Sequence, residues 1–353
     1  MTAGLRAPVG PPGPELYGGK PLSGTIKGEA ELIGTYLAPL ARGYPGAFGL
    51  GDDCAMFTPA PGTELVITTD AVAGGVHFFP DDAPQDIGWK ALAVNVSDLA
   101  AKGAVPRLYQ MALSFPEAPT HDVMARLAQG LAEAQAAFGI VLSGGDTDRR
   151  PGPMTITITA IGEVPAGYRL NRAGGRAGDR LFVSGTLGDA ALGLKVRRGD
   201  PDTQAWGLSE PERTALVGRY LRPVPRLDLR DALATWATAA LDLSDGLAKD
   251  LGRLAAASGT GAEIEVGRLP LSAAVHKILT IDATAVESVL GGGDDYEVLF
   301  AVPPESAGDV VAWARTAGVA VTEIGALTES AGVILQATDG SRRTLAPAGW
   351  DHF

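Results

Sequence analysis

Apolar residues at helical spacing predict three helices in the first half of the chain. A first stripe runs through Glu29 to Leu40, where one face carries Leu32, Ile33, Tyr36, Leu37 and Leu40. A second helix is predicted over Pro84 to Ala101, with Asp86 in its first turn and a stripe of Trp89, Leu92, Val96 and Leu99. The Ala- and Leu-rich segment His121 to Phe138 is the third, and Gly139 ends it.

Short β-branched or alternating runs predict strands between these helices. The run Leu65 to Thr69 is expected to deliver Asp70 at its end, and Arg107 to Ser114 forms a second strand. Ile140 to Leu142 leads directly into the turn Ser143-Gly144-Gly145-Asp146. Thr and Ile alternate within Met154 to Val164, which is the two-residue period of a half-buried strand.

The same pattern divides the chain into a leader and two domains. Residues 1–26 are rich in Pro and Gly without periodicity and are predicted to be a flexible leader. Residues 27–165 form the first predicted domain and residues 166–353 the second, separated by a Gly-rich stretch poor in apolar residues. Strands and helices alternate in both, so the expected fold class is α/β (α+β) with two layers.

Composition narrows the classes of protein. The 353 residues are 46% hydrophobic and 20% charged, which is ordinary globular content. A formal net charge of -12 disfavours nucleic acid as a partner, because the phosphate backbone would be repelled. Cys54 is the single cysteine, so neither an internal disulfide nor a multi-cysteine zinc site can form. The sequence contains no apolar run of about 18 residues, so no membrane span is predicted, and no signal peptide is evident. The cytoplasm is therefore the expected location.

Acidic, glycine-flanked turns are the candidate chemistry. They are Gly51-Asp52-Asp53, Thr68-Thr69-Asp70, Ser97-Asp98, Gly144-Gly145-Asp146, Asp242-Leu243-Ser244-Asp245 and Gly292-Gly293-Asp294-Asp295. Clustered carboxylates repel one another unless a cation neutralises them, and oxygen ligands favour Mg²⁺ over Zn²⁺. Since Mg²⁺ in proteins is usually shared with substrate phosphates, the pattern points to phosphoryl transfer from a nucleoside triphosphate.

Each motif also has a plainer interpretation. Asp52 and Asp53 could lie in a solvated turn, whereas Asp242 and Asp245 could cap the helix that follows them. Capping is compatible with function, because a helix N-terminus offers free N–H groups to a phosphate. His77 alone would more often be a partly buried surface histidine, and Cys54 a small core residue. No P-loop, protein-kinase signature, nucleophile elbow or H-E-x-x-H motif occurs.

Seven motifs, in order along the chain, closely resemble the thiamine-monophosphate kinase family. They read GDDCA, TTDAVAGGVHF, KALAVNVSDLAAKGAVP, SGGDTDR, SGTLGDAALGL, LDLSDGLAKDL and GGGDDYEVLF. The resemblance extends from about Gly28 to the C-terminal Gly-Trp-Asp-His-Phe. The wider superfamily contains aminoimidazole ribonucleotide synthetase, selenophosphate synthetase and a hydrogenase maturation protein, all of which use ATP.

The resemblance implies a two-domain aminoimidazole ribonucleotide synthetase-like fold, with an N-terminal ATP- and Mg²⁺-binding domain and a C-terminal α/β sandwich. It implies transfer of the γ-phosphate of ATP to thiamine monophosphate, in a homodimer whose N-terminal sheets pair near the ATP. By position, the implied Mg²⁺ ligands are Asp53, Thr68, Thr69, Asp70, Asp98, Asp146, Asp242 and Asp245. The implied ATP contacts are Gly145, Asp146, Arg172 and Ser244, and the implied substrate contacts are His77, Asp294 and Trp350.

Two residues depart from the family pattern. Asp294 stands where the family usually has Glu, and Trp350 where Tyr is common, which keeps an aromatic surface for the thiamine ring. The acceptor phosphate is already ionised at pH 7, so no general base is expected, and direct transfer is favoured over an aspartyl-phosphate. Two other functions stay open: a superfamily enzyme with another acceptor, and a catalytically silent nucleotide-binding dimer.

Overall fold

The computed structural model describes residues 22–346 and 348–351 and divides them into two compact units. Unit 1 comprises Leu99 and the described residues before it, together with Val105–Ala166. Unit 2 comprises Ala100–Ala104 and the described residues from Gly167 onward. Most of the predicted leader lies outside the described residues. Its last part is ordered, since Thr25 forms a β-bridge with Thr120 and Ile26 is buried.

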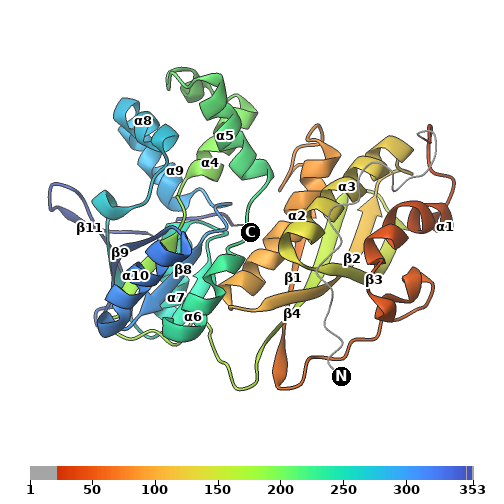
Figure 1. Ribbon diagram of the computed structural model, residues 1–353. Coiled ribbons are helices and arrows are strands. Elements are labelled where there is room, and N and C mark those ends of the chain that lie inside the picture. The colour runs from red at the N-terminus through yellow and green to blue at the C-terminus, as the bar shows by residue number, and fades with distance from the viewer. Residues whose placement is uncertain (1–21, 347, 352–353) are drawn as a thin grey trace. The chain divides into compact units, whose positions relative to one another are not determined.

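Unit 1 is built on a four-stranded sheet of order β1-β4-β2-β3 (Figure 1). Its strands are β1 (Thr63–Ala73), β2 (Val105–Phe115), β3 (Val141–Arg149) and β4 (Thr155–Pro165). β4 is antiparallel to both β1 and β2, whereas β2 and β3 run parallel. The parallel pair requires a crossover, which α3 supplies.

Helices α2 (Pro84–Ala101) and α3 (His121–Phe138) have the predicted bounds and lie over one face of this sheet (Figure 1). They approach closely where Gly88 of α2 meets the backbone of Leu127 and where Gly130 of α3 meets that of Gln85. A Cβ atom on Gly130 would lie 1.9 Å from the Gln85 carbonyl oxygen. Glycine at this position therefore fixes how tightly the two helices pack.

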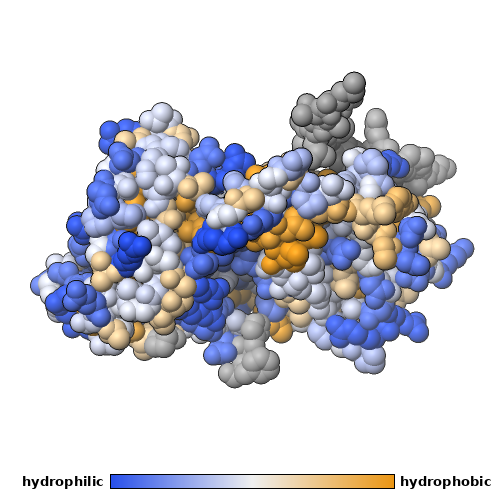
Figure 2. Space-filling view, turned by 90° about the horizontal axis from the view of Figure 1, so that it is seen from below, coloured by the Kyte–Doolittle hydropathy of each residue, from blue (hydrophilic) through white to orange (hydrophobic). Residues whose placement is uncertain are grey.

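The opposite face of the sheet carries exposed side chains. In β4 the even-numbered Ile156 and Ile158 are buried beneath the helices, while Thr157 and Thr159 on the other face are partly exposed. On the edge strand β1, Leu65 is 40% and Ile67 60% exposed. Figure 2 shows strongly hydrophobic residues gathered on the side of the molecule seen from below. Exposed apolar side chains on an edge strand are unusual in an isolated monomer.

The single helix predicted over Glu29 to Leu40 was wrong in form. The segment is one α-turn, α1 (Glu29–Leu32), followed by a π-turn (Ile33–Leu37) and a 3₁₀ turn (Ala38–Ala41). Gly34 has low helix propensity, and Pro39 has no N–H with which to continue the α-helical ladder. A further 3₁₀ segment, Pro45–Leu50, leads to the first acidic turn.

Unit 2 contains a seven-stranded sheet of order β11-β10-β7-β9-β5-β8-β6. The strands are β5 (Arg180–Ser184), β6 (Ala239–Asp242), β7 (Gly261–Glu265), β8 (Val298–Val302), β9 (Val321–Thr328), β10 (Gly332–Gln336) and β11 (Arg342–Thr344). The α-helices are α4 (Asp189–Arg198), α5 (Glu210–Leu221), α6 (Arg230–Trp236), α7 (Leu247–Ala257), α8 (Ala273–Ile281), α9 (Val286–Gly291) and α10 (Ala307–Ala317). Among the described strands of this sheet, β7 and β10 pair in parallel and the other neighbours are antiparallel.

Both faces of the central strands are covered. Leu181 and Val183 of β5 pack into one hydrophobic cluster, and the intervening Phe182 packs into another. Phe182 stacks on Phe300 of β8 with ring centroids 5.6 Å apart. The sheet is thus the middle layer of unit 2. Throughout the described residues, no helix is long and apolar enough to cross a membrane.

Candidate active site

A pocket of about 410 Å³ in unit 1 gathers three of the predicted site residues. Asp53 reaches it from the segment after the 3₁₀ turn, and Gly145 and Asp146 reach it from β3. Thr157 and Thr159 of β4 complete the side formed by the exposed sheet face. The pocket therefore has carboxylates, hydroxyls and glycine backbone in its wall, which suits a polar ligand that also carries cations.

Gly145 and Asp146 lie within strand β3, whereas the sequence predicted a turn after a strand ending at Leu142. Gly145 has φ 154°, and a Cβ atom there would lie 1.9 Å from the carbonyl oxygen of Met111 on β2. Pairing with β2 therefore continues through the glycines because they have no side chain to obstruct it. The backbone beside Asp146 is left open to the pocket.

Strand β1 also continues past the expected end, so Asp70 lies inside the strand and three more residues follow it, the last of which is Ala73. Thr68 Oγ1 donates to Asp98 Oδ2 of α2 at 2.5 Å, and Asp70 N donates to Asn95 Oδ1 at 2.9 Å. These bonds join β1 to α2. They explain why Asn95 and Asp98, three residues apart on α2, both face this strand.

Thr68 and Thr69 direct their side chains to opposite faces of the sheet, as successive strand residues must. Thr68 faces the helices, whereas Thr69 Oγ1 lies 2.9 Å from Thr159 Oγ1 on the exposed face. Thr159 also lines the pocket. The two threonine hydroxyls therefore cannot serve one ion from the same side of the sheet.

His77 is half-buried in a tight turn after β1. Its Nδ1 accepts a hydrogen bond from Ala73 N at 3.1 Å, and its own backbone N–H donates to Ala73 O at 2.9 Å. Accepting at Nδ1 requires that this nitrogen carries no proton, so a neutral ring has its proton on Nε2. The turn thus sets both the position and the tautomer of the imidazole.

In unit 2, backbone hydrogen bonds bring four predicted site residues together. Asp294 N donates to Ser244 O at 2.9 Å, and Trp350 N donates to Asp245 O at 3.1 Å. The bond between Asp294 and Ser244 extends the β6–β8 pairing beyond Asp242, because Leu243 N also donates to the carbonyl of Glu297, the residue before β8. Three segments that lie 50 and 105 residues apart in the sequence are therefore joined by backbone hydrogen bonds.

The turn that carries Asp294 has left-handed backbone at three of four successive residues. Gly293 has φ 73°, Asp294 has φ 62° and Tyr296 has φ 50°. Glycine adopts this region freely and Asp tolerates it, whereas Tyr does so at a cost of about 1–2 kcal/mol. Surrounding contacts must hold this shape, and such strain is typical of functional sites.

Asp245 has two cationic partners that the sequence analysis did not anticipate. Arg253 Nη1 lies 2.6 Å and Lys249 Nζ 3.4 Å from Asp245 Oδ2, both from α7. Lys249 also donates to the Trp350 carbonyl. The sequence did contain a signal for these pairs, because Lys249 and Arg253 follow Asp245 by four and eight residues along a helix that begins at Leu247. A metal ion at Asp245 would have to share or displace these partners.

Two further predicted residues differ in accessibility. Asp242 is buried at the end of β6. Arg172 is exposed; its carbonyl accepts a hydrogen bond from Ser258 Oγ at 3.0 Å, but its guanidinium has no hydrogen-bond or ion-pair partner in the described part of the chain. That free guanidinium retains all its donors for a phosphate.

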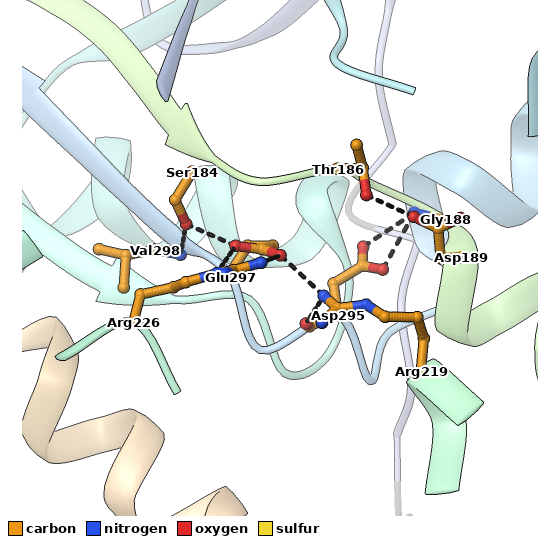
Figure 3. Close-up of polar contacts among 9 residues, drawn as sticks. All are labelled: Ser184, Thr186, Gly188, Asp189, Arg219, Arg226, Asp295, Glu297 and Val298. Atoms are coloured by element: carbon orange, nitrogen blue, oxygen red, sulfur yellow. Dashed lines mark hydrogen bonds and ion pairs between the residues drawn. The ribbon is translucent and has the colours of Figure 1, made fainter. Parts of the chain in front are cut away.

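A buried charged group beside the Asp294 turn was missed entirely (Figure 3). Glu297 is 0% exposed and accepts hydrogen bonds from Ser184, Arg219 and Arg226. Two positions earlier, the buried Asp295 accepts from Gly188 N at 3.0 and 3.2 Å. The only hint in the sequence was a carboxylate placed directly before a wholly apolar strand.

Within residues 22–346 and 348–351, no three His, Cys, Asp or Glu side chains lie close enough together to hold a metal ion. The structure brings predicted ligands together in smaller sets, Asp53 with Asp146 and Thr68 with Asp98, whereas Asp242 and Asp245 are neighbours only in sequence, three residues apart. All offer oxygen, the donor that Mg²⁺ prefers, and Mg²⁺ is commonly held by one or two carboxylates plus phosphates and water. The donor chemistry therefore fits Mg²⁺.

Comparison with known proteins identifies both domains. Residues 51–164 match the model of the AIR synthase related protein N-terminal domain, and residues 176–338 match its C-terminal domain. The chain is 42% identical to thiamine-monophosphate kinase of Caulobacter vibrioides, over 92% of this chain and 90% of that one.

Solved structures agree in fold. A thiamine-monophosphate kinase from Stenotrophomonas maltophilia superposes with a TM-score of 0.75 at 39% identity, covering 82% of this chain and 90% of that one. A structure of AaThiL complexed with AMPPCP and TMP gives a TM-score of 0.73 at 34% identity, covering 86% and 91%. The expected two-domain architecture is thereby confirmed.

Proposed function

Because the chain belongs to the thiamine-monophosphate kinase family, we propose that it transfers the γ-phosphate of ATP to thiamine monophosphate, giving thiamine diphosphate and ADP. One observation carries this proposal: similarity over 86% of the chain to a protein whose structure was solved in complex with AMPPCP and TMP. AMPPCP is an ATP analogue, so that complex holds an analogue of the proposed donor together with TMP, the proposed acceptor. The chain is on this basis a phosphotransferase.

The two units offer surfaces suited to the two substrates. In unit 1, the pocket with Gly145 and Asp146 exposes polar backbone for the nucleotide phosphates. In unit 2, Asp294 and Trp350 combine a carboxylate with an exposed indole. A carboxylate can accept hydrogen bonds from an aminopyrimidine, and an indole can stack on a cationic ring. Arg172, Ser244 and His77 are the remaining proposed contacts.

The reaction needs positioning rather than a general base. An oxygen of the acceptor phosphate attacks the γ-phosphorus in line, the bond to the β,γ-bridging oxygen breaks, and its electrons leave with ADP. The attacking oxygen is already ionised at neutral pH, so no proton must be removed. The protein's task is to hold two polyanions within bonding distance, and the free guanidinium of Arg172 assists by offsetting their charge.

Several Mg²⁺ ions complete the proposed site. In unit 1, the oxygen sets that would hold them are Asp53 with Asp146, with Thr69 on the same exposed face of the sheet, and Thr68 with Asp70 and Asp98 on the face covered by the helices. Unit 2 contributes Asp242 and Asp245. When bound, Mg²⁺ neutralises phosphate charge and fixes the phosphate geometry. Asp245 differs from the others because Arg253 and Lys249 already balance its charge.

We further propose a homodimer formed through the exposed face of the unit 1 sheet. Leu65 and Ile67 present apolar side chains there, opposite the face covered by α2 and α3. Thr157 and Thr159 lie on the same face and also line the pocket. A partner on this face would therefore lie close to the proposed nucleotide site and remove the exposed Leu65 and Ile67 side chains from water.

The decisive assay measures thiamine diphosphate formed from thiamine monophosphate and ATP, with and without Mg²⁺. Mg²⁺-dependent product is expected, and Asp98→Asn should lose turnover because it removes a charged oxygen bonded to Thr68. Asp122→Asn is the matched control, since Asp122 is an exposed residue of α3 whose side chain forms an ion pair with Arg126 one helical turn away.

The other outcomes separate the competing functions. ATP binding without formation of thiamine diphosphate would favour an enzyme of the same superfamily that uses a different acceptor substrate. That acceptor would be sought among phosphates and carboxylates. Absence of any ATP consumption would favour a catalytically silent nucleotide-binding protein. Full activity of the Asp98→Asn variant would contradict the assignment of Asp98 as a metal ligand.

A further inference from the structure

Glu297 is a fully buried carboxylate that has no role in the binding proposed above for either substrate. Arg226 binds it with two donors, Nε at 2.6 Å to Oε2 and Nη2 at 2.5 Å to Oε1, and Arg219 Nη2 adds a third at 2.7 Å. Ser184 Oγ donates a fourth at 2.6 Å (Figure 3). One carboxylate thus ties together the end of β5, helix α5, the segment after α5 and the start of β8.

This clamp is tightly packed. A Cβ atom on Gly185 would lie 2.2 Å from Glu297 Oε1, so the carboxylate fills the space beside the end of β5. Ser184 Oγ also accepts from Val298 N at 2.8 Å, which fixes the backbone immediately after Glu297. Charge-assisted and bidentate bonds of this kind restrict geometry more than neutral ones. The clamp therefore has one well-defined arrangement.

The clamp adjoins the strained turn that carries Asp294. Tyr296, in left-handed backbone, directly precedes Glu297, and Arg219 Nη2 also reaches the Asp295 carbonyl at 3.4 Å. Leu243 N donates to the Glu297 carbonyl at 2.8 Å, so the same residue anchors the backbone that leads to Ser244. Something must hold this turn in shape against its strain, and Glu297 is the charged group fixed at its base.

We propose that Glu297, held by Arg219 and Arg226, is a positioning residue that keeps the Gly292–Tyr296 turn in the form that presents Asp294 to the acceptor substrate. This inference rests on the proposed function for the identity of the acceptor, but the structural role does not depend on it. The nucleotide pocket of unit 1 is formed by other residues. Loss of the clamp should therefore weaken use of the acceptor more than use of ATP.

The test is Glu297→Gln, which keeps the shape and removes the charge. The KM for thiamine monophosphate should rise at least about tenfold, equivalent to about 1.4 kcal/mol of lost preorganisation, while the KM for ATP changes much less. Glu263→Gln is the matched control, because Glu263 pairs with Arg342 at the far side of the same sheet. It should leave both KM values unchanged.

A second readout is independent of the reaction. In Glu297→Gln, hydrogen exchange should accelerate at the Asp294 and Tyr296 amides, which donate to Ser244 O and Leu243 O, but not in β7. If wild type forms no thiamine diphosphate, the proposed function fails, yet exchange still tests the clamp. If Glu297→Gln does not fold, Arg219→Lys removes the planar donor from a partly exposed position and should give the same pattern more weakly. Unchanged exchange, or equal rises in both KM values, would overturn the proposal.

Discussion

Asp295→Asn should make unit 2 more stable at neutral pH, although it removes a buried acid. The carboxyl of Asp295 is enclosed in protein and accepts hydrogen bonds from Gly188 N through both oxygens. Burial, and then the nearby charge of Glu297, raises the pKa of Asp295 well above its ordinary value of 3.8. A carboxyl that stays protonated resembles an amide in shape and charge, so Asn can replace it and still accept from Gly188 N.

The sign and size of the effect follow from proton linkage. Below pH 3.8 the acid is protonated in folded and unfolded chains alike, and it imposes no penalty. As the pH rises towards the raised pKa, only the unfolded chain ionises, and the wild type loses about 1.4 kcal/mol of stability per pH unit. For a unit of this size that corresponds to about 3–6 °C in Tm per pH unit. The Asn variant has no such titration.

Scanning calorimetry of both proteins between pH 4 and pH 8 measures this difference. The Tm of Asp295→Asn minus that of wild type should increase with pH across the window. Asp309→Asn, at an exposed position in the first turn of α10, controls for general charge effects and should show no comparable trend. A difference that is flat with pH, or that falls as pH rises, would show that Asp295 is ionised in the folded protein.

Two more predictions concern unit 1. Gly145→Ala should lower the free energy of unfolding by about 1–3 kcal/mol and weaken AMPPCP binding, because the added Cβ would meet the Met111 carbonyl. Denaturation and AMPPCP-binding assays measure both effects. The control is Gly139→Ala, at a position that also has a positive φ but no atoms of the described residues near the added Cβ, and it should leave AMPPCP binding intact. Ile67→Asp should convert a dimer to monomers in sedimentation analysis, whereas Val311→Asp on α10 should not, and a wild-type monomer would refute the proposed dimer.

Local patterns predicted local structure well. Both long helices of unit 1 have their predicted bounds, because Pro84 starts one, Gly139 in left-handed backbone ends the other, and an apolar stripe runs along each. Tertiary pairing overrode local signals elsewhere. The glycines before Asp146 suggested a turn, yet pairing with β2 keeps them in β3, and Asp70 likewise remains within β1 because β4 pairs with it as far as Ala73.

The residues of the candidate site could be predicted only where they lie in short motifs that can be recognised in the sequence itself. The acidic motifs and the family resemblance named Asp53, Asp146 and Asp294 without any structure. The Glu297 clamp joins Ser184, Arg219 and Arg226, which lie 71 to 113 residues away, and no periodicity links them. Contacts of that range depend on which strands become neighbours, and single-sequence patterns do not determine the order of strands in a sheet.

The left-handed backbone at Asp294 gives the shorter acid at this position a physical meaning. With φ 62°, the residue occupies a conformation in which Asp and Asn are several-fold enriched over longer side chains. Glu would reach one methylene further but would fit this backbone less readily. At this position, a longer side chain would extend the carboxylate further but would also increase the strain of the left-handed backbone. The shape of the turn, together with the length of the side chain, therefore determines where the carboxylate lies.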